Sequence, residues 1–216
     1  MFPYPIATPQ GCNIQTFYGS STSTSTRNAR AWNKPVGVSH IYMMLIGAGG
    51  PAVSFTGGGS GAVTVWYGAA QHVPDSLLIT PAARTGAADS VVYYRGNSLI
   101  SLLTASGTNN TTGAPATTAG PFAASGFYKS TAGQNGSNVA ISASSTTFLG
   151  GGSGSGCVGN YGYAINNNEG GFFQMQPIIV GVGSSSNSDS ATAIGCGAGA
   201  NGASVGGPGM VLIASW

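Results

Sequence analysis

Few side chains in this sequence could perform acid–base, nucleophilic or metal chemistry. The histidines and carboxylic acids are His40, His72, Asp75, Asp89, Glu169 and Asp189. A glycosidase needs two carboxylates that converge on one bond, and nothing in this spacing brings two acids together. His72 and Asp75 flank Pro74 and could share a loop, where stabilising the turn is the simpler interpretation. His40 lies at the start of an apolar run, which favours a packed or rim histidine over a ligand. We therefore predict no catalytic residue and expect that the protein is not an enzyme.

The motifs for cofactors, nucleophiles and metals are incomplete. Gly47–Ala52 (GAGGPA) matches a dinucleotide-binding turn, but that turn needs a helix N-terminus to meet the pyrophosphate. Pro51 and the glycine run after it exclude such a helix. The GxSxG match at 202–206 has no Asp, Glu or His after it, as a hydrolase would require. The cysteines form no CxxC or Cys/His pair; they are Cys12, Cys157 and Cys196. We expect no cofactor and no metal.

The composition favours a folded protein with an almost uncharged surface. Of the 216 residues, 42% are hydrophobic, 5% are charged and 37 are glycine, and the net charge is +2. This charge is too small for the many phosphate contacts of nucleic-acid binding. No stretch reaches the ~18 apolar residues of a membrane helix, and residues 1–13 lack the pattern of a signal peptide. We expect neither nucleic-acid binding nor membrane insertion. Weak charge repulsion favours self-association.

The apolar pattern predicts strands along the whole chain. Val38–Ile46 is the clearest, and because both of its faces are apolar it should be a central strand covered on both sides. Shorter runs between Gly, Asn, Pro and Asp have the rhythm of a sandwich or barrel. A single helical turn fits Ala69–Pro74. The shorter predicted strands are Ile14–Tyr18, Ala29–Trp32, Ala62–Tyr67, Leu77–Thr80, Ser90–Tyr94, Leu99–Thr104, Val139–Ser142, Thr146–Leu149, Phe172–Val182 and Met210–Trp216.

Low-complexity segments connect these strands. Glycine-rich runs lie near residues 46–61, 148–156 and 195–209. We predict surface loops there; glycine supplies either a permissive backbone or extended segments that stack and hydrogen-bond laterally. Residues 105–137 show no clear elements around the apolar island Pro121–Tyr128, which predicts a functional surface loop. We predict two parts for the chain: an extended N-terminal arm and linker (1–30), and one glycine-rich β-sandwich domain (31–216).

Two groups of aromatic and apolar residues could contact a partner. Rings in the loops could stack on the sugars of a host receptor or anchor the loops to the body, and we favour anchoring. The candidates for glycan contact are Phe55, Phe122, Tyr128, Tyr161 and Tyr163. Phe2, Tyr4 and Ile6 alternate with prolines in an extended segment. This suits an assembly arm that docks on a neighbouring protein, and a frayed terminus explains the pattern equally well.

Four pieces of the chain resemble the glycine-rich domain of phage tail-fibre and related virion appendage proteins. They are WNKPVGVSHIYMMLIGAGG (Trp32–Gly50), GGGSGAVTV (Gly57–Val65), TTFLGGGSGSG (Thr146–Gly156) and GGPGMVLIASW (Gly206–Trp216). The resemblance implies an antiparallel β-sandwich of jelly-roll type, a homo-oligomer that is commonly a trimer, and display on the virion surface. Residues 105–140 depart from it, because they are rich in Ser, Thr and Ala.

We therefore predict an all-β virion surface structural protein, of bacteriophage origin, that assembles with other virion proteins. A capsid decoration protein and a tail or head fibre component both fit, since the chain has no long shaft. Host attachment through a surface glycan is part of this hypothesis. The alternative is a carbohydrate-binding or carbohydrate-active β-sandwich protein that uses the loop aromatics.

Overall fold

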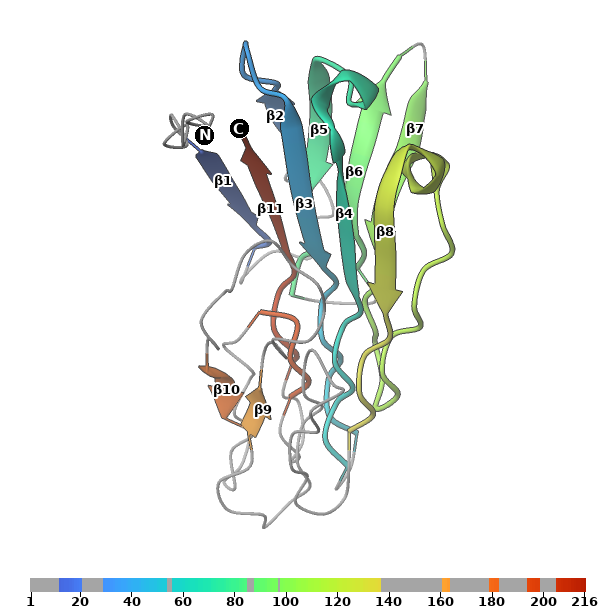
Figure 1. The fold of residues 1–216 in the computed structure, drawn as a ribbon. Coiled ribbons are helices and arrows are strands. Elements are labelled where there is room, and N and C mark those ends of the chain that lie inside the picture. The colour runs from blue at the N-terminus through green and yellow to red at the C-terminus, as the bar shows by residue number, and fades with distance from the viewer. Residues whose placement is uncertain are drawn as a thin grey trace, which may run out of the picture.

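The structure is a computed structural model, and Figure 1 shows its fold. The residues that it describes are 12–20, 29–53, 56–84, 88–96, 98–136, 161–163, 179–182, 194–198 and 205–216. The described strands form mainly two antiparallel sheets that pack face to face.

The larger sheet has five strands in the order β1-β11-β3-β4-β8, all antiparallel. Its strands are β1 (Asn13–Tyr18), β3 (His40–Ile46), β4 (Val63–Ala69), β8 (Gly126–Thr131) and β11 (Met210–Ser215). β3 lies at the centre, and its residues from Ile41 to Ile46 are all buried. The prediction of a central strand covered on both faces is confirmed.

The smaller sheet has four strands in the order β2-β5-β6-β7, with a register shift between Val92 and Tyr93. Its strands are β2 (Arg30–Asn33), β5 (Ser76–Thr80), β6 (Ser90–Arg95) and β7 (Leu99–Ala105). Two short 3-10 helices connect the sheets: η1 (Ala70–His72) lies between β4 and β5, and η2 (Pro121–Ser125) lies between β7 and β8. A separate two-stranded sheet is formed by β9 (Tyr161–Tyr163) and β10 (Ile179–Val182). The helical turn predicted at Ala69–Pro74 is η1.

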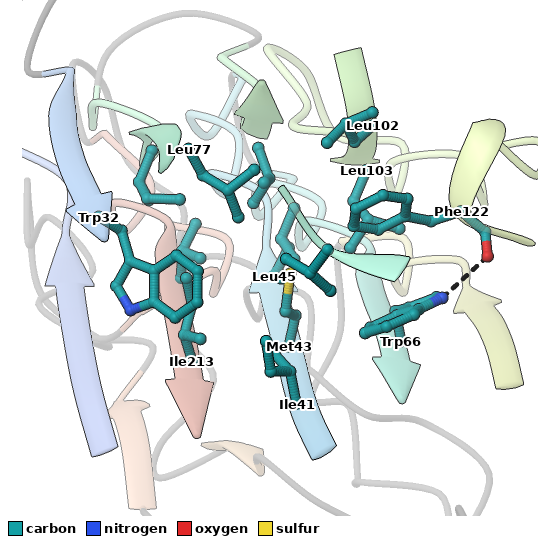
Figure 2. Packing of buried hydrophobic residues seen from close by; sticks show 14 of the residues in the cluster. Trp32, Ile41, Met43, Leu45, Trp66, Leu77, Leu102, Leu103, Phe122 and Ile213 are labelled. Carbon is teal, nitrogen blue, oxygen red and sulfur yellow. Dashed lines mark hydrogen bonds between the residues drawn. The ribbon is translucent and has the colours of Figure 1, made fainter. Parts of the chain in front are cut away.

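The main hydrophobic core lies between the two sheets (Figure 2). Period-two alternation sends the odd-numbered residues of β3 into it, because successive side chains of a strand point to opposite faces. Its largest fully buried side chains include Trp32, Ile41, Met43, Leu45, Trp66, Leu77, Leu103 and Ile213. The even-numbered residues Tyr42, Met44 and Ile46 form a second buried cluster on the opposite face, with Cys196 and Met210.

The predicted all-β antiparallel sandwich is confirmed; the jelly-roll topology stays a prediction. Two predictions need correction. β1 lies inside the segment predicted as an arm and linker, yet it pairs with β11 and buries Phe17 in the core, so the division at residue 31 fails there. The segment 105–137, predicted as one long surface loop, contains η2 and β8. The predicted strands Val139–Ser142 and Thr146–Leu149 lie outside the described residues, as does most of Phe172–Val182.

Candidate functional site

Glycine-rich segments from several parts of the chain meet at one end of the sandwich, below the strands in Figure 1. We call this assembly the glycine bundle; it comprises residues 47–50, 57–62, 106–114, 133–136, 195–198 and 205–209. Its segments follow β3, β7 and β8 and precede β4 and β11. The bundle therefore extends four strands of the larger sheet and the edge strand β7 of the smaller sheet.

The backbone hydrogen bonds of the bundle have a period of three. Amides three residues apart in the segment 57–62 reach the same neighbouring segment. The bonds to carbonyl oxygens are Gly58 to Ala198 (2.8 Å), Gly59 to Asn110 (2.9 Å), Ser60 to Gln134 (2.9 Å), Gly61 to Gly195 (2.8 Å) and Ala62 to Ser106 (2.9 Å). A β-strand repeats every two residues, whereas a polyproline II helix has three residues per turn and no internal hydrogen bonds. Segment 57–62 is thus the centre of a bundle of extended segments bonded laterally.

The segment after β3 follows the same rule. Gly47 and Gly50 both donate to the segment 57–62, at the carbonyls of Ala62 (2.9 Å) and Gly59 (2.8 Å). Residues 47–50 and 57–62 are all buried. The prediction that these glycine runs are surface loops is wrong, because lateral bonds satisfy backbone groups that a loop would leave to water. Among residues 47–53 there is no helix, so the dinucleotide-binding interpretation finds no support.

Glycine is required in the bundle because the segments approach too closely for a side chain. A Cβ on Gly59 would lie less than 3.0 Å from the carbonyl oxygen of Thr112, and a Cβ on Gly197 would lie equally close to the carbonyl of Gly58. Both obstacles are backbone atoms, which cannot rotate away. The glycine content of the chain is thus partly a packing requirement.

Two of the described titratable residues, Asp89 and His72, contact backbone groups of neighbouring segments. Asp89 accepts a hydrogen bond from the N–H of Gly107 (2.9 Å), and the imidazole Nδ1 of His72 lies 2.9 Å from the carbonyl oxygen of Ser125. In the described part of the chain no three His, Cys, Asp or Glu residues are grouped to hold a metal ion. Glu169 and Asp189 lie outside the described residues. Burial raises the pKa of Tyr42 from 10.0 to about 12, so its hydroxyl stays protonated at neutral pH.

Lys34 directly follows β2 and connects it to the turn around η1. Its Nζ donates to the carbonyl oxygens of Val73 (2.7 Å) and Ala70 (3.2 Å) and lies 2.8 Å from Asp75 Oδ1. The Lys34 side chain is 19% exposed, whereas that of Asp75 is 95% exposed. The bonds to the two carbonyls are therefore the stronger part of this contact.

Replacement of Lys34 by methionine is expected to lower the free energy of unfolding by about 2 kcal/mol, because hydrogen bonds from a charged donor contribute roughly 1.5–3 kcal/mol. Replacement of Asp75 by asparagine should change it by less than about 0.5 kcal/mol, since exposed ion pairs contribute little. Chemical denaturation of both variants measures the difference. Equal losses would show that the ion pair, and not the carbonyl contacts, holds the turn.

His40 is a packed rim residue, as predicted. Its ring stacks on those of Tyr67 and Trp216, with centroids 5.7 and 6.1 Å away, and its Nδ1 lies 2.9 Å from Ser39 Oγ. The rings of Tyr67 and Trp216 also stack on each other, at 5.9 Å. These three rings close the outer face of the larger sheet at the end remote from the bundle (Figure 1).

Two candidate glycan-contact residues anchor the loop to the body instead. Phe122 is 5% exposed and packs on Trp66 with ring centroids 5.0 Å apart, and its carbonyl oxygen accepts a bond from Trp66 Nε1 (2.8 Å; Figure 2). For Phe122 the structure shows the anchoring role that the sequence favoured over glycan contact. Tyr128 packs against the same core, and its hydroxyl donates to the carbonyl oxygen of Thr117 (3.0 Å).

The other candidates cannot be placed in this way. Phe55 and the proposed arm residues Phe2, Tyr4 and Ile6 lie outside the described residues. Tyr161 and Tyr163 lie in β9, and their side chains are not described.

Sequence reasoning missed a group of exposed amides on the glycine bundle. Asn110 Oδ1 accepts a bond from the N–H of Thr112 (2.7 Å), and Asn135 Oδ1 accepts one from the N–H of Gly113 (2.8 Å). Both residues are exposed. With the amide oxygens held by backbone, the NH2 groups are the donors available to a ligand. Nothing in the low-complexity sequence distinguishes these asparagines from their neighbours.

Comparison of the chain with protein-family models gives no match, and comparison with curated proteins gives none either. No helix among the described residues is long and apolar enough to cross a membrane.

Proposed function

We propose that the protein is a non-enzymatic structural component of a virion surface, a decoration protein of the capsid or part of a tail or head fibre. The observation that carries this proposal is the glycine bundle, which extends a neutral β-sandwich with laterally bonded backbone. Such a body gives an external particle protein a rigid projection with few charged side chains. Its partners would be other virion proteins.

Three of the four pieces that resemble virion appendage proteins fall on residues that build this body, and the fourth, Thr146–Gly156, lies outside the described residues. Trp32–Gly50 supplies the buried Trp32, the central strand β3 and the first bundle segment, Gly57–Val65 supplies the central bundle segment, and Gly206–Trp216 supplies β11. The last piece is far from the other two in sequence, yet all three are hydrogen-bonded in one sheet through β3, β4 and β11. The resemblance thus covers a connected structural unit, which supports the proposal.

Locating the chain on particles tests the structural role. Antibody against the purified protein, applied to virions of the virus that encodes it, should label a regular position on the capsid, tail or fibres. Absence of the protein from purified virions would contradict the proposal. Turnover of a host polysaccharide by the purified protein would contradict the non-enzymatic part of it.

Host attachment would use the uncharged donors of the bundle surface. Replacing Asn110 and Asn135 together by aspartate, which removes the NH2 donors and keeps an acceptor oxygen at each position, is expected to reduce binding of the protein to host cells at least tenfold. Ser98→Ala, at the exposed β6–β7 turn, serves as the control because it leaves the bundle unchanged. The melting temperature should stay unchanged, since aspartate can still accept the bonds from the N–H groups of Thr112 and Gly113. If the double asparagine variant binds host cells as well as Ser98→Ala does, these asparagines do not attach the virion to its host, and the role of the protein is decoration alone.

A further inference from the structure

β1 is the outer strand of the larger sheet, and among the described strands it pairs with β11 alone (Figure 1). Its six residues keep an unbroken register with β11, from Asn13 opposite Ser215 to Tyr18 opposite Met210. The strand contains no charged residue, no proline and no bulge. Edge strands usually carry one of these protections, because their free backbone groups otherwise recruit another strand.

The other described edges are protected. β2 has only four residues and begins at the exposed Arg30. At the opposite side of the sandwich the segment around Thr117 runs between β7 and β8; its hydroxyl donates to the Thr104 carbonyl (2.7 Å) and its N–H donates to Ser130 Oγ (2.9 Å). β8 also carries Lys129. β1 therefore stands apart from the other three edges of the two main sheets.

The pairing with β11 fixes which backbone groups of β1 are free. Gly19 donates its N–H to the carbonyl oxygen of Gly209 (2.9 Å), one residue beyond the strand. In an antiparallel pair only alternate residues bond to a given neighbour. The residues whose N–H and C=O groups face β11 are therefore Asn13, Gln15 and Phe17. The residues whose groups face the open edge are Ile14, Thr16 and Tyr18.

The side chains of this open set are also unusually exposed. Ile14 is 53% exposed and Tyr18 is 52% exposed, although both are large and apolar. They lie on the same face of the strand as Thr16, two residues to either side of it. Phe17, on the other face, is 7% exposed and belongs to the core.

We propose that β1 pairs antiparallel with β1 of a second copy of this chain, about a two-fold axis at Thr16, to form a homodimer with one continuous sheet. Thr16 then lies opposite Thr16 of the second copy, and Ile14 lies opposite Tyr18 of the second copy. Every outward N–H and C=O group of Ile14, Thr16 and Tyr18 finds a partner in this register. The two exposed apolar side chains meet in a β-branched–aromatic pair, which is a favourable cross-strand combination.

This self-complementarity identifies the occupant as a second copy. A two-fold axis brings the same surface of both subunits together, and only the register centred on Thr16 pairs all three open residues. A shift by two residues leaves either Ile14 or Tyr18 without a partner. The net charge of +2 for 216 residues adds little repulsion between copies. The trimer implied by the family resemblance does not follow from this edge.

The mass of the full chain in solution tests the pairing. Light scattering should give twice the chain mass of 21.3 kDa. Thr16→Pro should give the single-chain mass with an almost unchanged melting temperature, since the lost N–H faces the open edge, where proline is tolerated. Gln15→Pro should instead lower the melting temperature, because its N–H faces β11. A monomeric or trimeric wild-type protein, or a dimer that Thr16→Pro leaves intact, overturns the proposal.

A disulfide test fixes the register. In a Cys12→Ser/Cys157→Ser background, Thr16→Cys should form a covalent dimer on mild oxidation, because residues directly opposite in a ladder have Cα atoms about 5.5 Å apart, within the disulfide range of roughly 4.4–6.8 Å. Ile14→Cys in the same background is the control, since two copies of residue 14 would be about 13 Å apart along the strands. Equal crosslinking of both variants overturns the register, and so does the absence of crosslinking by Thr16→Cys.

Discussion

Replacement of Gly59 by alanine is expected to lower the free energy of unfolding by about 3 kcal/mol, at the upper end of the cost of overpacking a buried site. The new Cβ would lie within 3.0 Å of the carbonyl oxygen of Thr112. Gly59 is also hydrogen-bonded on both sides, as donor to Asn110 and as acceptor from Gly50. Any backbone shift that relieves the clash therefore lengthens bonds to two neighbouring segments.

The control for this prediction is Gly96→Ala, at the turn between β6 and β7. There the nearest atom to a new Cβ is Cε1 of the Tyr94 ring, at 3.2 Å, and that side chain is 39% exposed and can move. We expect a change of less than about 0.5 kcal/mol, as for most surface substitutions. Urea denaturation of both variants decides the matter. Similar small effects at both positions would show that the bundle segments are not closely packed.

Replacement of Trp66 by alanine is expected to lower the free energy of unfolding by about 4 kcal/mol, the usual cost of removing a large aromatic core residue. Trp66 is 0% exposed, packs on Phe122 and donates its indole N–H to the Phe122 carbonyl oxygen (Figure 2). The substitution therefore leaves a cavity, and the Phe122 carbonyl oxygen keeps only the bond from Ser125 Oγ (2.9 Å). It should also free η2, which Trp66 joins to β4.

Phe127→Ala is the control for Trp66. Phe127 lies on the adjacent strand β8, but its side chain is 49% exposed. A loss of about 1 kcal/mol or less is expected, because little apolar area leaves the interior. Thermal unfolding of the two variants gives the comparison. If Trp66→Ala lowers the free energy of unfolding no more than Phe127→Ala does, Trp66 is not a core residue and the described core is wrong.

The strands of the sandwich were largely predictable from sequence. Their β-branched and aromatic residues recur with period two, and this local pattern needs no knowledge of the partner strand. β8 was missed because Gly126–Thr131 combines one aromatic pair with Gly, Lys, Ser and Thr inside a low-complexity segment. Its place in the sheet depends on pairing with β4, far away in sequence.

Lateral bonding of extended glycine segments was one of the two uses of glycine expected from the sequence, but the partners of each segment and their burial were not predictable. The bonds of Gly59 to Asn110 and of Gly61 to Gly195 join segments that are distant in sequence. Glycine leaves no side-chain pattern to indicate such partners, so a buried segment and a flexible loop have the same composition. The roles of Phe122 and Lys34 also follow from tertiary contacts, with Trp66 and with the carbonyls of the η1 turn.

Amide hydrogen exchange of residues 57–62 tests the central claim most directly. If these residues form the centre of the glycine bundle, the amides of Gly58 to Ala62 should be protected to the same degree as those of β3, because all of them donate to backbone carbonyls in a buried environment. Mass spectrometry of a peptide that covers this segment, compared with a peptide from β3, gives the ratio. Exchange of the glycine segment at the rate of an unstructured peptide, while β3 stays protected, would contradict the account.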